Sequence, residues 1–446
     1  MISLKEVKKI FDKGSKHSLL LSNISWQSLE RGCRILAGIY TGILLASYLG
    51  PESLGAYSYA QSFILLFSPL ISLGYDGFLS RDIIFQKDKW ADILGSSALL
   101  KLLGSTLSIL LIWGLTYLDK SIATETKSLI RVLSLSFIFY PFDVFDIWFR
   151  AKLKSKNASI SKIIALVIIN ALKILFIYQK AALMSFSWLY VAEFVVNGIL
   201  QFAFYIKNEP RNLRQWKVSN ERIKYVILES WPLLVSTFSL MIYNRIDQIM
   251  IGNMLDNKSV GIFSAAGKIA DLPLALIMVI NASIYPFLAA TYKDNFSQFQ
   301  KQYRIITDLF TALSYIMLAV VLIGAGWIIS IYPASFTPGA IILKINFIGL
   351  IFIFNSALRN SYLSLTGNQK LLLYSTVLSA ILNILLNLFL IPAYGINGAA
   401  WASTITEFTA LFLFNGVFLK TRDIFKIQAN SLILSTLLKR AISNKV

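Results

Sequence analysis

The chain has 446 residues, of which 56% are hydrophobic and 15% are charged. Soluble domains carry about 25% charged residues, so this composition excludes an ordinary soluble protein. It predicts an all-α membrane protein with about twelve spans of roughly 20 residues each. The formal net charge of +19 raises the question of a nucleic-acid partner.

The first 20 residues place lysines on a partly apolar background, which predicts an amphipathic lead-in lying on an anionic membrane surface. No signal peptide is evident, because the apolar run that follows is too long and no small-residue cleavage site comes after it. The remaining chain then divides into apolar runs separated by polar connections. The expected spans lie near 22–49, 55–79, 94–118, 128–149, 160–178, 185–206, 228–252, 260–290, 305–332, 340–365, 371–391 and 396–419.

Loop charge predicts the orientation of these spans. With both termini on one side, the connections on that side hold about 30 Lys and Arg, against about 5 on the other side. This asymmetry predicts a multi-pass protein with both termini in the cytoplasm. It also accounts for most of the net charge without any nucleic acid. The connections on the far side are short, so no extracytoplasmic domain is expected.

Short similarities recur between the two halves of the chain. The stretch Leu54–Ala60 resembles Val260–Ala266, and three pairs recur further on: Asn170 with Asn383, Trp188 with Trp401, and Glu193 with Glu407. Six spans per half is an even number, so the halves are predicted to be parallel repeats, which form two lobes around a central cleft. The predicted parts are 1–20 (lead-in), 21–206 (first lobe), 207–227 (basic cytoplasmic connector), 228–420 (second lobe) and 421–446 (basic cytoplasmic tail).

The first span contains three charged residues, Glu30, Arg31 and Arg34. A charge at the centre of a lipid-exposed helix costs about 3 kcal/mol on insertion scales, so these side chains must face something other than lipid. Their spacings of three and four residues allow all three to share one helix face. Gly38 and Gly42, in the same span, form a small-xxx-small pair that permits close helix contact.

Further cations lie in other spans, and they are expected to line a hydrated cavity, to pair with acids or to extend to the membrane surface. Lys173 and Lys344 lie near span ends, where extension to the surface is the preferred interpretation. Cations on the first helices of both lobes suit a cleft that carries an anion, and arginine offers bidentate geometry for phosphate oxygens. The predicted substrate-binding residues are Arg31, Arg34, Lys101, Arg245 and Lys268.

Acidic residues within the spans are candidates for the site of a coupling proton or cation. For each of them a structural ion pair is an equally good interpretation; Lys268 and Asp271, three residues apart, can pair with each other. Arg245 and Asp247 are two residues apart, so they cannot share a helix face and are expected to have different partners. The candidates are Asp76, Glu193, Asp247, Asp271 and Glu407.

The chain lacks the residues that most enzyme sites need. It has one cysteine, Cys33, and one histidine, His17, so no metal-ligand cluster or Ser-His-Asp arrangement is expected. No P-loop motif is present, which argues against ATP hydrolysis by this chain. The sequence therefore predicts neither cofactor nor metal, and a protein that is not an enzyme.

Three motifs resemble those of bacterial polysaccharide flippases, the O-antigen and capsule repeat-unit translocases of the multidrug/oligosaccharidyl-lipid/polysaccharide exporter superfamily. The resemblance extends over nearly the whole chain. The motifs are Leu49-Gly50-Pro51-Glu52 with Gly55, Tyr57, Ser58 and Ala60, continued by Leu73–Gly77 and Arg81; Tyr243–Gly252; and Pro392, Tyr394, Gly395 and Gly398–Ala400 with Glu407.

The resemblance implies two six-helix lobes and a lipid-linked substrate, an oligosaccharide on undecaprenyl diphosphate. This substrate would be flipped from the cytoplasmic to the outer leaflet by alternating access. By motif, Arg245 and Asp247 are implied to lie in the central cavity, whereas the match at Arg31 and Arg34 is looser. Implied partners are the membrane, the lipid-linked oligosaccharide and other proteins of the pathway, such as a polysaccharide polymerase.

Three other functions are considered beside this one. A multidrug efflux antiporter has the same fold but needs an acidic cleft for cationic drugs, whereas the strongest embedded charges here are basic. A polysaccharide polymerase or ligase usually has a large extracytoplasmic loop, which this chain lacks. A flippase for teichoic or peptidoglycan lipid precursors differs only in its substrate, and the sequence leaves that choice open.

Overall fold

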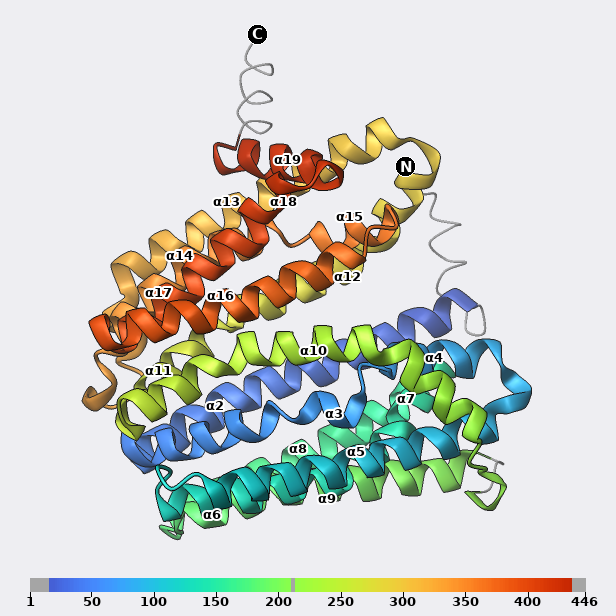
Figure 1. Ribbon diagram of the computed structural model, residues 1–446, viewed down its shortest axis with the longest axis horizontal. Coiled ribbons are helices and arrows are strands. Elements are labelled where there is room, and N and C mark those ends of the chain that lie inside the picture. The colour runs from blue at the N-terminus through green and yellow to red at the C-terminus, as the bar shows by residue number, and fades with distance from the viewer. Residues whose placement is uncertain (1–15, 210–212, 435–446) are drawn as a thin grey trace. The chain divides into compact units, whose positions relative to one another are not determined.

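The computed structural model describes residues 16–209 and 213–434 (Figure 1), so most of the predicted lead-in lies outside the described residues. Every regular element in these ranges is a helix, which confirms the all-α prediction. The earlier helices are α2 (Lys16–Leu65), α3 (Ser68–Ser72), α4 (Asp76–Phe85), α5 (Trp90–Leu118), α6 (Thr124–Ser134), α7 (Asp143–Ala151), α8 (Ser155–Tyr178), α9 (Leu183–Asn208) and α10 (Asn220–Met254).

The later helices follow one another through short connections. They are α11 (Asn257–Ala270), α12 (Leu272–Asp294), α13 (Phe296–Ile329), α14 (Gly339–Asn355), α15 (Arg359–Leu365), α16 (Lys370–Tyr394), α17 (Ile396–Glu407), α18 (Phe414–Val417) and α19 (Arg422–Leu432).

The chain forms two compact units. The first holds the described residues up to Tyr48 together with Phe63–Phe238, and the second holds Leu49–Ser62 with the chain from Ser239 onward. The boundary therefore falls three times inside a helix, twice in α2 and once in α10. In the first unit α8 packs along α9, and in the second α16 packs along α17 and α13 along α14.

Ten helices in the described ranges are long and apolar enough to cross a membrane, or eleven if the bent pair Ile396–Val417 and Leu419–Leu432 counts as one span. One of the ten, Ser22–Phe85, is a 64-residue stretch that runs from α2 through α3 to the end of α4. It contains the first two predicted spans. Counting it as two spans makes the structure consistent with the predicted twelve. The bounds otherwise follow the predicted spans to within a few residues at most ends.

The break between the first two spans is at Gly50. The 50 residues of α2 would be about 75 Å long as one straight helix, more than twice the roughly 30 Å of a hydrocarbon core. Gly50 has φ 69° and ψ 175°, a conformation open essentially to glycine alone. Pro51 follows and cannot donate the next helical hydrogen bond. The Gly-Pro pair thus ends the first span and lets the second begin.

Immediately after this bend, α2 crosses α11 at very close range within the second unit. A Cβ atom on Gly55 would lie 1.7 Å from the carbonyl oxygen of Asn257, and one on Gly261 would lie 1.9 Å from that of Pro51. The hydroxyls of Ser58 and Ser264 are 3.0 Å apart at the same crossing.

This crossing is reciprocal in sequence. Ser58 and Ser264 are 206 residues apart, and the same spacing relates Gly55 to Gly261 and Pro51 to Asn257. Equivalent residues of the two halves therefore make equivalent contacts, as a two-fold relation between repeats requires. By contrast, no described atom of a neighbouring helix lies within 4 Å of a Cβ built on Gly38 or Gly42, so the predicted small-residue pair is not where helices approach closely.

The described residues of the predicted connector (207–227) and tail (421–446) are partly helical, and they pack against other helices of the protein. Lys217 N donates to Ala91 O at 3.2 Å and Ser219 N to Ser96 Oγ at 3.0 Å, which attaches the connector to α5. At the other end, α19 turns away from the preceding helix by 110° and packs against α13 and α18 (Figure 1). Tyr315 Oη donates to Leu432 O at 2.7 Å and holds α19 in place.

Candidate functional site

Polar side chains on one face of α2 connect it to α8 and α9 within the first unit. They recur every seven residues, which is close to two helical turns, so they share one face. The charged first span therefore packs its polar face against protein, as predicted. The contacts are Gln27 to Ser155 (3.1 Å), Arg34 to Glu193 (3.1 Å), Thr41 to Asn170 (2.8 Å) and Tyr48 to the carbonyl of Ala181 (2.8 Å).

Arg34 is the charged centre of this face. Its Nε donates to Glu30 Oε1 at 2.9 Å, one helical turn back, and its Nη1 donates to Glu193 Oε1 of α9 at 3.1 Å. The Arg34 side chain is still 45% exposed, whereas the Glu30 side chain is 11% exposed. A guanidinium has five N–H donors, so Arg34 keeps donors for a further acceptor.

A hollow of about 100 Å³ opens beside the Arg34–Glu193 pair. This volume is about that of three waters, or of one tetrahedral oxyanion. Lys162 lines it from α8, and its Nζ lies 2.8 Å from Asp146 Oδ1. The lining residues are Arg34, Lys162, Ala165, Glu193, Phe194 and Asn197.

The other two cations predicted for the first unit differ from Arg34. Arg31 is exposed and makes no ion pair with any described residue, so it takes no part in the ion pairs that connect Arg34 with Glu30 and Glu193. Lys101 is buried, with its Nζ 2.7 Å from Asp76 Oδ1 and 3.4 Å from Asp143 Oδ2. Arg34 also contacts two carboxylates, but its side chain stays 45% exposed, whereas the Lys101 side chain is 4% exposed and is therefore much less accessible to a ligand.

In the second unit the corresponding helices α10, α16 and α17 enclose a carboxylate. Asp247 is buried and accepts hydrogen bonds from Asn387 Nδ2, at 2.6 Å, and from Ser403 Oγ. Asn387 Nδ2 also lies 3.2 Å from Asn383 Oδ1. Asp247 and Thr41 are separated by the same 206 residues as the serines at the repeat crossing, so Asp247 stands at the position of Thr41. Its partner Asn387 lies one helical turn beyond Asn383, the residue that matches Asn170.

This carboxylate has no cationic side chain as a partner among the described residues. Asn387 Oδ1 is also buried without a hydrogen-bond partner in the described structure, and the Asn383 side chain interacts with the Asp247 carboxylate as well. A buried, unpaired carboxylate is costly, and bound protons or cations relieve that cost. The arrangement of carboxylate, carboxamide and hydroxyl oxygens can hold a proton or a small hard cation.

Glu407 lies on the same helix as Ser403, one turn further on. Its Oε1 accepts from Tyr243 Oη at 3.0 Å, and its Oε2 is buried without a hydrogen-bond partner among the described residues. A Cβ on Gly349 would lie 1.9 Å from that Oε2. Glycine at position 349 therefore makes room for the carboxyl group.

The remaining predicted residues of the second unit are Arg245, Lys268 and Asp271. Arg245 is half-buried, and its guanidinium interacts electrostatically with the Asp271 carboxyl, which is exposed. Asp247 instead contacts α16 and α17, so the prediction that Arg245 and Asp247 have different partners is confirmed. Lys268 is exposed on α11.

Sequence reasoning missed four polar residues. Lys162 and Asn197 line the hollow beside Arg34, and Asn387 and Ser403 donate to Asp247. Asn387 carried a signal, because it follows Asn383 by one helical turn in an apolar run, and two carboxamides on one face of a membrane helix seek a polar partner. Lys162 lies so close to the start of its span that it is indistinguishable from an ordinary interfacial lysine.

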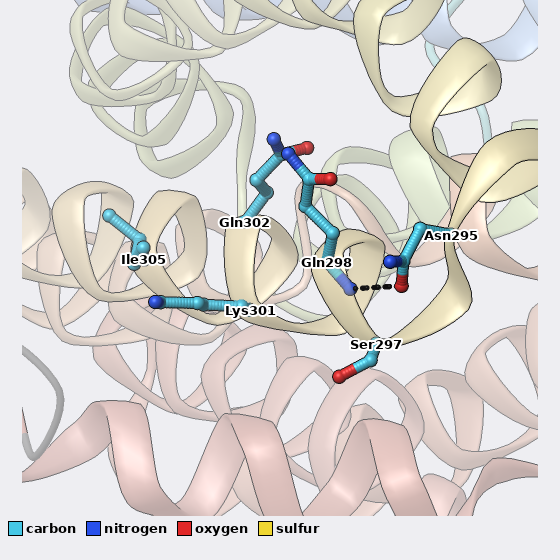
Figure 2. A pocket seen from close by; sticks show the side chains of 6 residues that line it. All are labelled: Asn295, Ser297, Gln298, Lys301, Gln302 and Ile305. Carbon is cyan, nitrogen blue, oxygen red and sulfur yellow. Dashed lines mark hydrogen bonds between the residues drawn. The ribbon is translucent and has the colours of Figure 1, made fainter.

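A second, larger hollow lies at the start of α13 (Figure 2). Its volume is about 470 Å³, and none of the predicted site residues lines it. Asn295 Oδ1 accepts from Gln298 N at 3.0 Å and caps the helix. Lys301 is its one charged lining residue, whereas two cationic side chains line the hollow at Arg34. The lining residues are Asn295, Ser297, Gln298, Lys301, Gln302 and Ile305.

Two family models match the sequence. The model described as polysaccharide biosynthesis protein matches residues 20–292, and the model described as MatE matches residues 232–389. The first match covers more than half of the chain and includes all of α2 to α11 apart from the first turn of α2.

Relatives and solved structures agree with these matches. The chain is 23% identical over 276 residues to the "Putative O-antigen transporter" of Escherichia coli (strain K12), which is 61% of this chain and 65% of that protein, just under two thirds. It is 23% identical over 373 residues to the "Capsular polysaccharide biosynthesis protein CapF" of Staphylococcus aureus, 81% of this chain and 89% of that protein.

A solved structure titled "Lipid II flippase MurJ, inward closed conformation" superposes with a TM-score of 0.70 at 16% identity. The superposition covers 93% of this chain and 92% of that one. At this identity the likeness establishes the fold. It agrees with the all-α membrane fold predicted from the sequence.

Proposed function

Because the chain belongs to the polysaccharide biosynthesis protein family, we propose that it is a flippase for a lipid-linked oligosaccharide. The substrate is a repeat unit of O-antigen or capsule type on undecaprenyl diphosphate, moved from the cytoplasmic to the outer leaflet of a bacterial inner membrane. Both termini lie in the cytoplasm, on the side where the loops carry most of the Lys and Arg. The names of the two relatives support the substrate class.

The observation that carries this proposal is the half-exposed guanidinium of Arg34, which opens on a hollow the size of one phosphoryl group. An arginine with free donors inside an apolar helix bundle favours an anionic ligand, and the fork of the guanidinium fits phosphate oxygens. Arg31, exposed and without an ion pair among the described residues, adds a second cation three residues away on the same helix. The neutral or cationic drugs of a multidrug transporter would gain nothing from these charges.

Transport also needs a driving force, and the second unit offers a place for it. Asp247 binds the coupling proton or cation, because its buried carboxylate lacks a cationic partner among the described residues and is surrounded by carboxamides and a hydroxyl. Glu407 is the second candidate, and Asp76, Glu193 and Asp271 follow because each of them interacts with a Lys or Arg side chain.

Replacing both Arg31 and Arg34 by alanine is expected to abolish export in a host strain whose own flippase gene is deleted. Each charge-assisted hydrogen bond to phosphate contributes about 1.5–3 kcal/mol, so losing two such contacts lowers transport more than about 100-fold. The measurement is surface polysaccharide by immunoblot, together with the lipid-linked precursor that accumulates in the cells.

The matched control is Lys156→Ala, which removes one positive charge from α8 at a position that does not line the hollow. This variant should export polysaccharide at the wild-type level. Full rescue by the double arginine variant would refute the role of both arginines. Restored drug resistance without restored polysaccharide would instead identify a multidrug antiporter.

A further inference from the structure

We infer that the hollow between α2, α8 and α9 takes one phosphoryl group of the lipid-linked substrate, that Lys162 and Asn197 contact it beside Arg34, and that Glu193 is the exchangeable carboxylate this group displaces. The inference rests on the proposed function. It adds two contact residues and an exchange of ion pairs to that function.

The donors around the hollow form an anion site. Arg34 comes from α2, Lys162 from α8 and Asn197 from α9, so three helices each contribute a polar side chain. The oxygen of Asn197 already accepts from Gln201 Nε2 at 3.2 Å, which leaves its amide NH₂ as the group available to a ligand. Two cationic side chains and an amide donor match the acceptor oxygens of a phosphoryl group.

Of the two carboxylates that contact Arg34, Glu193 lines the hollow and Glu30 does not. Glu30 lies on the same helix as Arg34, contacts its Nε and is nearly buried, so it holds the guanidinium in position. Glu193 reaches across from α9 to Nη1, lines the hollow, and its side chain is 22% exposed. A diphosphate carries more negative charge than one carboxylate, so it outcompetes Glu193 for Arg34.

Each displaced group has a second partner at hand. Glu193 also interacts electrostatically with Lys173 of α8, so its carboxylate keeps a cation in its surroundings when it leaves Arg34. Asp146, which holds Lys162, has its other oxygen 2.8 Å from Arg150 Nη2. Lys162 can therefore turn to a phosphoryl group without leaving Asp146 unpaired. The exchange of ion pairs thus leaves no buried charge without a nearby opposite charge.

The test measures binding of farnesyl diphosphate, a short soluble polyprenyl diphosphate, to the purified full-length protein in lipid nanodiscs. Lys162→Ala should weaken binding at least about fivefold, because it removes one cationic contact. Glu193→Gln should strengthen binding at least about threefold, because it removes the competing charge and keeps the shape of the side chain. Lys156→Ala, the charge-matched control on α8, should change binding less than twofold.

Separate probes distinguish the sources of the anion. Inorganic pyrophosphate should compete with farnesyl diphosphate, whereas farnesol, which has no phosphate, should not. Competition by farnesol and not by pyrophosphate would show that the prenyl chain alone is bound, and would overturn the inference. Lys162→Arg keeps the positive charge, so this variant should bind farnesyl diphosphate within about twofold of wild type. It replaces the alanine variant in the test if that variant does not fold.

The outcomes also separate this inference from the proposed function. If Arg34→Ala abolishes binding while Lys162→Ala and Glu193→Gln behave like Lys156→Ala, the inference fails and the flippase proposal stands. If Glu193→Gln weakens binding, Glu193 is part of the binding surface and the exchange is refuted. If the double variant of Arg31 and Arg34 exports polysaccharide normally, the proposed function itself fails.

Discussion

Replacing Gly55 by alanine should prevent the protein from folding normally. The new Cβ would lie 1.7 Å from the carbonyl oxygen of Asn257, so two backbones would have to separate at the crossing of α2 and α11. Overpacking of a close contact costs about 1–3 kcal/mol even when side chains can adjust, and here the opposing group is backbone. We expect a several-fold loss of monodisperse protein after detergent extraction, measured by size-exclusion chromatography of a fluorescent fusion.

Gly38→Ala is the matched control for this prediction. Gly38 lies in the same helix as Gly55, and no described atom of a neighbouring helix is within 4 Å of the Cβ that alanine would add. This variant should fold as well as wild type, or slightly better because alanine favours helix. Equal yields and equal thermal stability for Gly55→Ala and Gly38→Ala would show that the close crossing does not exist in the folded protein.

Replacing Asp247 by asparagine should abolish transport without destabilising the protein. Asparagine keeps the size of the side chain. Its oxygen can still accept from Asn387, and its NH₂ group can donate to the Ser403 hydroxyl, but it cannot carry the negative charge that binds a coupling ion. Removing an unpaired buried charge also removes its desolvation cost. We expect surface polysaccharide to fall at least about tenfold, a change of about 1.4 kcal/mol or more in the transport step, while the melting temperature stays constant or rises.

The Ser403→Ala variant tests how much transport depends on the hydrogen bond from the Ser403 hydroxyl to Asp247. It keeps the Asp247 carboxylate and removes one neutral hydrogen bond, so transport should fall by less than the Asp247 change produces. Wild-type export by Asp247→Asn would rule out a coupling role for this carboxylate. A large fall in melting temperature would show instead that Asp247 is a structural hydrogen-bond acceptor.

The sequence was sufficient to predict the fold, because in a membrane the length and polarity of each apolar run nearly determine a helix. It also predicted that the charges near Arg34 must face protein, because the cost of exposing them to lipid is large. The repeat was visible in the Gly55 and Gly261 motifs. It was not visible that these glycines touch the opposite backbone, because packing between segments 206 residues apart leaves no local pattern.

The details of the site depended on helix rotation and on partners distant in sequence. Arg31 and Arg34 are three residues apart, and spacing alone could not show that only Arg34 turns toward α9. The partner of Arg34, Glu193, is 159 residues away, and nothing in the sequence pairs the two. Lys101 resembled any other embedded cation until the structure placed Asp76 and Asp143 beside its ammonium.

The most direct test of the central claim is translocation by the purified protein in liposomes. The substrate is a fluorescent oligosaccharide linked to undecaprenyl diphosphate, and the readout is the fraction that becomes accessible to a quencher outside the vesicles. Vesicles with wild-type protein should move the lipid faster than protein-free vesicles, and those with the Arg31 and Arg34 double alanine variant should match the protein-free rate. Equal rates for folded wild-type protein and protein-free vesicles would contradict the flippase account.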